Sequence, residues 1–150
     1  MADTSTLATE RMIVAATPER CFAVAADIER YPVWAGDIKE VTVHDRDDEG
    51  RPQLVTFRAA AFGRSTTYTL AYDFSAAPRV LAWRLTQGDI TTKLDGSYEF
   101  GAAAGGGTEL TYHLEVEIRV PIPGFIKMRA QSRIMSTALL DLKARAEAPA

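Results

Sequence analysis

Five aromatic side chains with polar tips are the residues of this sequence best suited to recognise a small molecule. Each falls in phase with apolar neighbours in a segment of alternating character, and together they are Tyr68, Tyr72, Trp83, Tyr98 and Tyr112. A buried phenol or indole needs a hydrogen-bond partner for its hydroxyl or N–H group. A ligand or a trapped water molecule would supply that partner. The set therefore predicts a hollow interior with a polar edge.

A different interpretation holds for any one of these tyrosines taken alone. Single tyrosines in strands commonly pack at the rim of a sheet with the hydroxyl in solvent. The whole set favours a cavity, because a solid core prefers Leu, Ile, Val and Phe side chains. The other residues predicted to contact a ligand are Phe57 on the sheet and Met128, Ser132 and Met135 on the last helix. Methionine adapts to variable partners, and a serine between two methionines leaves space.

Groups that commonly transfer protons or bind metals are poorly placed in this chain. His44 lies beside an acidic turn, and His113 is out of phase with the apolar face of its segment, so both are expected at the surface. Cys21 lies among apolar residues and is expected to be buried rather than nucleophilic. No cluster of His, Cys and carboxylate residues has the spacing of a metal site. We therefore predict no metal and no cofactor, and the catalytic residues stay unknown.

Basic residues near the predicted cavity have two interpretations. Arg64 lies at a turn, where its side chain could line the cavity mouth. Lys127, Arg129 and Arg133 on the last helix are expected to face solvent. The alternative is that these three residues frame an entrance that attracts an anionic ligand.

The composition is that of one globular domain. The chain has 150 residues, of which 47% are hydrophobic and 25% are charged, and this is enough to build a single core. We expect one ligand-binding domain over residues 1–150, with an ordered core over about 6–147. The net charge of -3 argues against nucleic acid as a partner, because such binding needs clustered Lys and Arg.

The first residues of the chain and the length of its apolar runs indicate where in the cell the protein is expected. The single cysteine excludes an intramolecular disulfide, and the opening MADTSTLATE lacks the basic and apolar regions of a secretion signal. The apolar runs are far shorter than the ~20 residues that span a bilayer. We therefore expect a cytoplasmic protein with no integral membrane association, either a monomer or a homodimer.

The first part of the chain predicts a strand over residues 7–16 and then two short helices. Thr17 can cap the first of these helices, and Pro18 suits its first position. Tyr31 and Trp34 lie at the end of the second and are expected to plug one end of the fold as large rings.

From residue 38 to residue 120 the residues alternate between apolar and polar, which is typical of β-strands. Short turns join these strands, so the sheet should be antiparallel with one covered face. The predicted fold class is α+β: a curved seven-stranded sheet around one long C-terminal helix, with two short helices between the first and second strands. That final helix is predicted over residues 121–148, with a covering stripe made of Phe125, Met128, Ser132, Met135, Leu139 and Leu142.

Four segments carry a resemblance to a known superfamily. They are TPERCFAVAADIERYPVW at 17–34, LDGSYEF at 94–100, GGGTELTYHLEVE at 105–117 and PIPGF at 121–125. In this order they resemble the START-like, or SRPBCC, superfamily, and in particular its polyketide cyclase/dehydrase and lipid-transport group. The resemblance implies a helix-grip fold with an elongated apolar cavity between the sheet and the last helix. It places the opening near residues 31–34 and the start of that helix.

The residues and the resemblance together leave three functions open. The first is binding of a small hydrophobic molecule, such as a lipid, a polyketide or a quinone-like compound, by burial of apolar surface. The second is a polyketide cyclase or dehydratase in which a tyrosine hydroxyl donates a proton to an enolate-like transition state. The third is an accessory or interaction protein that resembles the coenzyme Q-binding relatives of the superfamily.

Overall fold

The structure is a computed structural model that describes residues 6–61 and 63–149. Its strands are β1 (Thr6–Val14), β2 (Ile38–Arg46), β3 (Pro52–Ala61), β4 (Arg64–Asp73), β5 (Val80–Gly88), β6 (Thr91–Ala102) and β7 (Thr108–Ile118). Its helices are α1 (Pro18–Ala26), a 3₁₀ turn at Ile28–Arg30, α2 (Tyr31–Trp34) and α3 (Gly124–Glu147). The elements follow one another in the predicted order.

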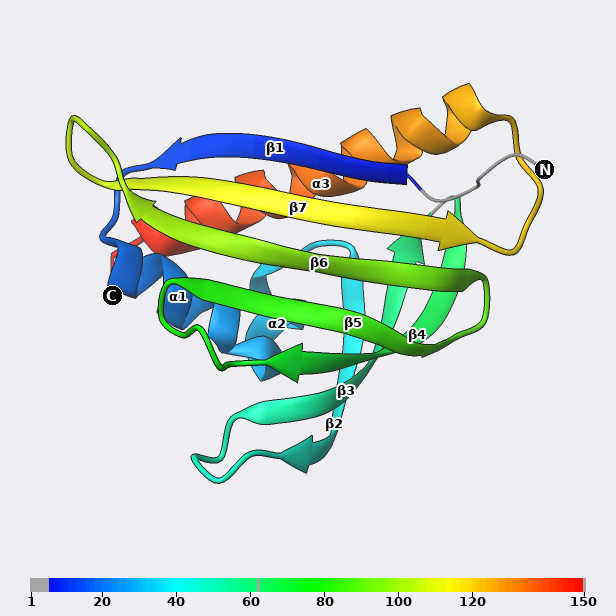
Figure 1. Ribbon diagram of the computed structural model, residues 1–150, viewed down its shortest axis with the longest axis horizontal. Coiled ribbons are helices and arrows are strands. Elements are labelled where there is room, and N and C mark those ends of the chain that lie inside the picture. The colour runs from blue at the N-terminus through cyan, green and yellow to red at the C-terminus, as the bar shows by residue number, and fades with distance from the viewer. Residues whose placement is uncertain (1–5, 62, 150) are drawn as a thin grey trace.

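The strands form one antiparallel sheet in the order β1-β7-β6-β5-β4-β3-β2. Figure 1 shows α3 crossing behind β1 and β7, with α1 and α2 on the same side of the sheet. The other side of the sheet carries no helix within the described ranges. This arrangement confirms the predicted α+β class, in which a curved sheet wraps around a long C-terminal helix.

Helix α1 begins where the sequence predicts. The backbone N–H of Arg20 donates to the hydroxyl of Thr17 at 3.1 Å, and Pro18 occupies the first turn. A side-chain cap of this kind satisfies one of the free amide groups at a helix start. The preceding strand β1 is shorter than predicted and ends at Val14, because the next residues bond elsewhere. The N–H of Ala15 donates to the carboxylate of Glu147 at 2.7 Å.

Helix α3 begins at Gly124, three residues later than predicted. Pro123 has an extended backbone and flanks the helix start, and the prolines at 121 and 123 keep the intervening residue out of the helical conformation. The helix then runs 24 residues to Glu147. This length lets it cross the covered face of the sheet.

The predicted covering stripe of α3 is right in its second half and wrong in its first half. Met135, Leu139 and Leu142 are buried, but the members before them are exposed: Phe125, Met128 and Ser132. Lys127 and Gln131 take the buried positions instead, which also corrects the expectation that Lys127 faces solvent. The side-chain amide of Gln131 donates to the carbonyl of Leu114 at 3.0 Å. A polar contact with strand β7 therefore sets the phase of the helix here.

Cys21 is fully buried in the core, as predicted. Burial raises the pKa of its thiol, which disfavours the reactive thiolate. Over residues 6–61 and 63–149, no helix is long and apolar enough to cross a membrane.

Candidate ligand-binding site

A cavity of about 140 Å³ lies between the inner face of the sheet and α3. All five tyrosines of the chain line it, although they come from four different elements. They are Tyr31 of α2, Tyr68 and Tyr72 of β4, Tyr98 of β6 and Tyr112 of β7. Trp34, Phe57 and Trp83 add three more aromatic rings to the wall.

The structure brings six of the nine predicted ligand-binding residues to this wall. These six are Phe57, Tyr68, Tyr72, Trp83, Tyr98 and Tyr112. The other three come from α3 and lie outside the cavity. Met135 is buried in the core, Met128 is 60% exposed, and Ser132 is exposed with its hydroxyl 3.5 Å from the carboxylate of Glu10. Their misplacement follows from the helix phase described above.

Helix α3 instead presents a different row of residues to the cavity. This row consists of Ile134, Thr137, Ala138 and Asp141, which recur at three- and four-residue steps along one side of the helix. Two of the four are polar, so a search for an apolar stripe misses them. The spacing is the signal that could have found them.

The aromatic rings form a continuous chain of contacts. Tyr98 and Tyr112 are directly opposite each other in the β6–β7 pair, with ring centroids 4.6 Å apart. Trp83 lies 5.2 Å from Tyr98 and 6.0 Å from Tyr72, measured between ring centroids. Such spacings are those of favourable aromatic pairs. The rings therefore stiffen one another and give the cavity a defined shape.

The phenol groups of the cavity are all held in the neutral form. Burial raises the pKa of Tyr68, Tyr72, Tyr98 and Tyr112 well above the ordinary value. Burial likewise raises the pKa of Tyr31, whose hydroxyl donates to the carbonyl of Ala25. A neutral phenol both donates and accepts a hydrogen bond. The wall therefore offers uncharged hydroxyl groups at neutral pH.

Two threonines missed at the sequence level also reach the cavity. Thr66 is buried, and its hydroxyl donates to the carboxylate of Asp89. Thr91 is 3% exposed, and its hydroxyl has no hydrogen-bond partner within the described part of the chain. A buried hydroxyl without a hydrogen-bond partner lowers the stability of the fold. A ligand atom that bonds to Thr91 would remove this penalty. The alternation of β4 puts Thr66 in phase with Tyr68 and Tyr72, so a signal for it was present in the sequence. Thr91 is out of phase with Leu94 and Tyr98 because the register shifts between Thr91 and Lys93, and no alternation marks it.

Charged groups at the cavity are confined to one place. Among the described lining residues the only charged side chains are Asp37 and Asp141, and none is Lys, Arg or His. Both residues are half-buried, and Ala60, which also lines the cavity and whose N–H donates to the carbonyl of Asp37 at 2.8 Å, is exposed. We take this side of the cavity as its opening, because the lining residues here are partly in solvent. The N–H of Gly36 donates to Asp141 at 3.1 Å and ties the loop after α2 to α3.

The position of this opening differs in part from the one that the resemblance implied. Trp34 lies beside the opening, as expected for residues 31–34. The α3 residues that line the cavity on this side, Thr137 and Asp141, belong to the second half of the helix and not to its start. Arg64 is exposed and does not line the cavity, so it does not form the mouth.

The two histidines lie outside the cavity. His44 is exposed, as predicted, and its ring is 2.7 Å from the hydroxyl of Thr56. His113 is half-buried on the outer face of the sheet, with its ring nitrogens 2.8 Å from the Thr9 hydroxyl and 2.6 Å from Glu99. Neither ring can reach a molecule in the cavity.

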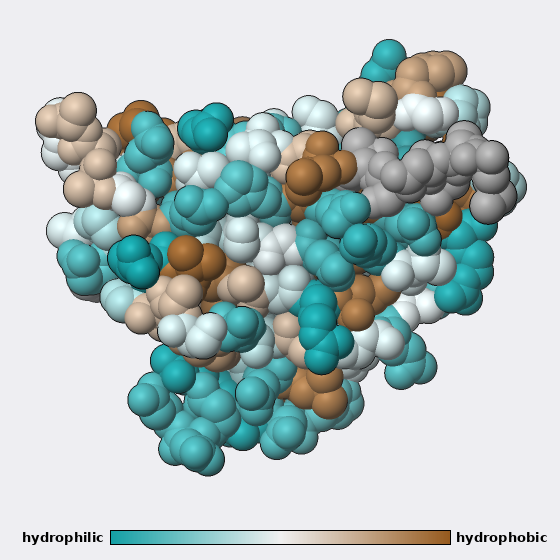
Figure 2. Space-filling view, viewed as in Figure 1, coloured by the Kyte–Doolittle hydropathy of each residue, from teal (hydrophilic) through white to brown (hydrophobic). Residues whose placement is uncertain are grey.

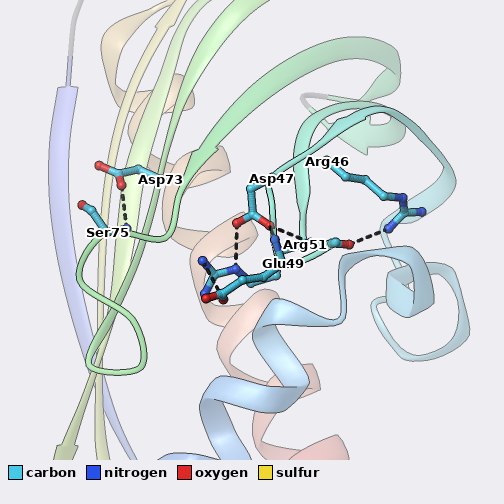
Figure 3. Close-up of polar contacts among 7 residues, drawn as sticks. Arg46, Asp47, Glu49, Arg51, Asp73 and Ser75 are labelled. Carbon is cyan, nitrogen blue, oxygen red and sulfur yellow. Dashed lines mark hydrogen bonds and ion pairs between the residues drawn. The ribbon is translucent and has the colours of Figure 1, made fainter.

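A second hollow lies around the β2–β3 hairpin and the end of β4, and it is polar. Its side chains are engaged with one another, as Figure 3 shows: Asp47 bonds to Arg51 at 2.8 Å, and Asp73 accepts the N–H of Ser75 at 2.8 Å. Burial alone would raise the pKa of Asp47, but hydrogen bonds from Arg51 and Glu49 outweigh this and lower it. No group of three metal-ligating residues occurs within residues 6–61 and 63–149.

Comparisons with known proteins agree with this geometry. The profile of the family described as polyketide cyclase / dehydrase and lipid transport matches residues 5–147. A search for similar sequences among curated proteins found no match.

Three solved structures superpose on nearly the whole chain. A START superfamily protein from Mycobacterium smegmatis has 26% identity and a TM-score of 0.87, covering 94% of this chain and 97% of the other. The Zhui aromatase/cyclase from Streptomyces sp. R1128 has 17% identity and a TM-score of 0.83, covering 95% and 94%. A protein from Thermus thermophilus has 19% identity and a TM-score of 0.78, covering 94% and 97%. With its sheet, its enclosing helix and a profile match over nearly its whole length, the chain belongs to the polyketide cyclase/dehydrase and lipid transport family and has the START-like helix-grip fold.

Proposed function

We propose that the protein binds a small, uncharged hydrophobic molecule in the cavity between the sheet and α3. The observation that carries this proposal is the convergence of eight aromatic rings from six elements on one hollow. A solid core prefers side chains without polar atoms, whereas phenols in the wall of a hollow can pair with the polar edge of a ligand. The Tyr31 hydroxyl already donates to the carbonyl of Ala25, so this role falls to the phenols of the sheet.

The size of the cavity limits the ligand. Its volume of about 140 Å³ is close to that of an engineered apolar cavity of about 150 Å³ that holds benzene. One ring, or a fused pair that extends toward the opening, is the matching size. A longer lipid or polyketide would have to protrude past Asp37 and Asp141 or displace side chains of the wall.

The charge of the lining limits the ligand further. A carboxylate that entered the cavity would lose its hydration without meeting a cationic side chain among the described lining residues. The carboxylates of Asp37 and Asp141 at the opening would repel it as well. The lining therefore supports a ketone, a quinone-like compound or an alcohol over a free fatty acid. This argument weighs against the alternative of a basic entrance for anions.

Matched probes test the proposal. Native mass spectrometry of the purified protein would first show any molecule that copurifies. Titration with 2-acetonaphthone and with 2-naphthoate, followed by the fluorescence of Trp34 and Trp83, then compares a neutral and an anionic molecule of similar shape. We expect 2-acetonaphthone to bind at least tenfold more tightly, because the cost of burying an unpaired charge exceeds the roughly 1.4 kcal/mol of a tenfold change. Absence of saturable binding, or preference for 2-naphthoate, would refute it.

Cyclase or dehydratase chemistry is a second candidate. It is favoured by the position of the phenols in the cavity wall, because a neutral phenol can donate a hydrogen bond to a developing enolate. Burial raises the pKa of Tyr98 and Tyr112, which makes full proton transfer from them harder and favours this hydrogen-bonding role. Its test is turnover of a linear poly-β-ketone substrate by the wild type and by Tyr72→Phe and Tyr112→Phe. Loss of about 100-fold or more in kcat in one variant would support it. Product formation equal to background would eliminate it.

The role of an accessory protein beside a larger complex stays a prediction. It needs a protein partner, and a pull-down from native extract with the intact chain would test it. Recovery of the same partner by a variant with a filled cavity would separate this role from ligand binding.

A further inference from the structure

The first half of α3 has an exposed face that combines apolar and basic side chains. Phe125 is 66% exposed, Ile126 is 44% exposed and Met128 is 60% exposed, while Arg129 and Arg133 are also exposed. Large apolar side chains with this exposure are unusual when they gather in one place. We call residues 124–133 the α3 tip.

Helical geometry places Phe125 within this face and puts Ile126 and Met128 on either side of it. Phe125, Arg129 and Arg133 are four residues apart and share one side of the helix, opposite the buried Lys127 and Gln131. Figure 1 shows this end of α3 projecting past the adjacent sheet strands. In the space-filling view the projecting end carries hydrophobic atoms next to hydrophilic ones (Figure 2). The face is therefore accessible as a unit.

The charge around the α3 tip opposes that of the whole chain. The sequence has 17 basic and 20 acidic residues, yet residues 119–140 contain four basic residues and no acidic residue. One carboxylate lies beside the tip: Glu10 of β1 accepts from the hydroxyls of Ser132 and Ser136 and keeps its negative charge. The exposed charges of the tip itself are those of Arg129 and Arg133, since Lys127 is buried. Two exposed guanidinium groups against one carboxylate leave this end of the helix with an excess of positive charge on an acidic protein.

We propose that the α3 tip docks on the surface of an anionic lipid bilayer. Phe125, Ile126 and Met128 enter the boundary between headgroups and acyl chains, and Arg129 and Arg133 lie among the lipid phosphates. Exposed apolar residues flanked by Arg are typical of helices that lie in the bilayer interface. Basic residues next to the surface add attraction to anionic lipids.

The charge distribution favours a bilayer over a second copy of the chain. A symmetric dimer through the α3 tip would bring the same basic residues of two copies together, and like charges in an interface are unfavourable. An anionic bilayer supplies both an apolar layer and complementary phosphates. The inference does not depend on the proposed ligand, because the tip and the cavity wall use different sides and different residues of α3.

Vesicle flotation with the full chain tests the inference. The protein is mixed with vesicles of phosphatidylcholine alone or of phosphatidylcholine with phosphatidylglycerol, at about 0.1 M and at higher salt. We expect flotation only with phosphatidylglycerol vesicles, weakened by salt. The double variants Phe125→Ser/Met128→Ser and Arg129→Glu/Arg133→Glu should each lower the partition coefficient about tenfold or more.

Two control variants and two readouts keep the test decisive. Leu140→Ser removes an apolar side chain that is 55% exposed further along α3, and Arg84→Glu reverses an exposed charge on the sheet. Both should float like the wild type. Circular dichroism and binding of 2-acetonaphthone should stay unchanged in the tip variants, which shows that fold and cavity are intact. Equal binding to both vesicle types, no binding, or tip variants that float like the wild type would overturn the proposal. So would a dimer in lipid-free solution that both tip variants abolish.

Discussion

Gly96 lies directly opposite Trp83 in the β5–β6 pair, and a Cβ atom on Gly96 would come within 2.8 Å of the Trp83 ring. The same atom would lie 2.4 Å from the carbonyl oxygen of His113, which belongs to the backbone of β7. Because Gly96 has no side chain, the Trp83 ring can pack against the backbone of β6 in the cavity wall. The absence of a side chain at Gly96 therefore helps to determine the shape of the cavity.

Gly96→Ala should destabilise the protein and disturb the cavity. The added methyl group clashes with backbone that cannot retreat, so we expect a loss of about 1–3 kcal/mol in the free energy of unfolding. Urea unfolding, followed by Trp fluorescence, measures the change. Gly101→Ala on the same strand is the control, because its Cβ would meet its nearest neighbour, a carbonyl oxygen of Glu109, at 3.9 Å. Equal stability of the two variants would contradict the proposed role of Gly96.

Ala138→Phe should fill the cavity. Ala138 lies on the cavity side of α3, so a phenyl ring there occupies space that a ligand needs. We expect the affinity for 2-acetonaphthone to fall about tenfold or more, the cost of about one lost ring contact. Ala144→Phe adds the same ring at an exposed position of the same helix and should bind like the wild type. Unchanged binding by Ala138→Phe would place the ligand elsewhere.

Thr91→Val should separate recognition of a polar group from packing. Valine removes the unpaired hydroxyl and keeps the shape, so the free energy of unfolding should stay equal or rise. Binding of 2-acetonaphthone should weaken about fivefold, the value of one hydrogen bond of about 1 kcal/mol. Naphthalene has no acceptor, and its affinity should not change. Equal losses for both compounds would show that Thr91 acts only through packing.

The tyrosines should make the protein sensitive to alkaline pH. Their pKa values are raised in the folded state, so their stabilising effect is fully present below the unfolded pKa of about 10 and is lost as pH rises through the folded pKa. We expect the phenolate absorbance to appear only together with unfolding. A spectrophotometric pH titration with parallel circular dichroism checks this. Ionisation of all five tyrosines near pH 10 without unfolding would contradict the buried placement.

Glu147 should contribute stability at neutral pH that disappears in acid. Hydrogen bonds from Lys143 and from the N–H of Ala15 lower its pKa, so this stabilisation is present above the unfolded pKa of about 4.3 and is lost as pH falls through the folded pKa. Glu147→Gln should lower the melting temperature at pH 7 but not at pH 3. The exposed Glu109→Gln is the control. A difference that persists in acid would mean that the loss is not electrostatic.

The strands could be predicted because side chains alternate between the two faces of a sheet. A shift of one residue would move the charged side chains of a strand to the buried face, so the alternation also shows which residues face inward. Leu110, Tyr112, Leu114 and Val116 are buried as their alternation requires. The cavity tyrosines of β4, β6 and β7 were found for the same reason. The alternation does not give the exact cross-strand partners, because the register shifts between Thr69 and Leu70 and between Thr91 and Lys93.

The phase of α3 was not predictable in the same way. A helix buries the face that finds partners, and the partner of Gln131 is a backbone carbonyl of β7, which no sequence pattern reveals. Thr91 lies at the start of β6, where its residue type gives no sign of burial. Asp37 and Asp141 line the same cavity although they are far apart in the sequence, and the hydrogen bond from the N–H of Gly36 to Asp141 forms only in the folded chain.

The five phenols reach one hollow from α2, β4, β6 and β7, and four of them belong to strands whose ladder bonds use only main-chain atoms. Exchanging any of those four for phenylalanine removes one hydroxyl, with the bonds that it makes to other side chains, and leaves the main-chain ladder intact. Substitutions at these positions can therefore change, one at a time, which hydrogen-bond donors a bound ligand meets. Chains with this architecture can diverge in what they accept while staying almost superimposable.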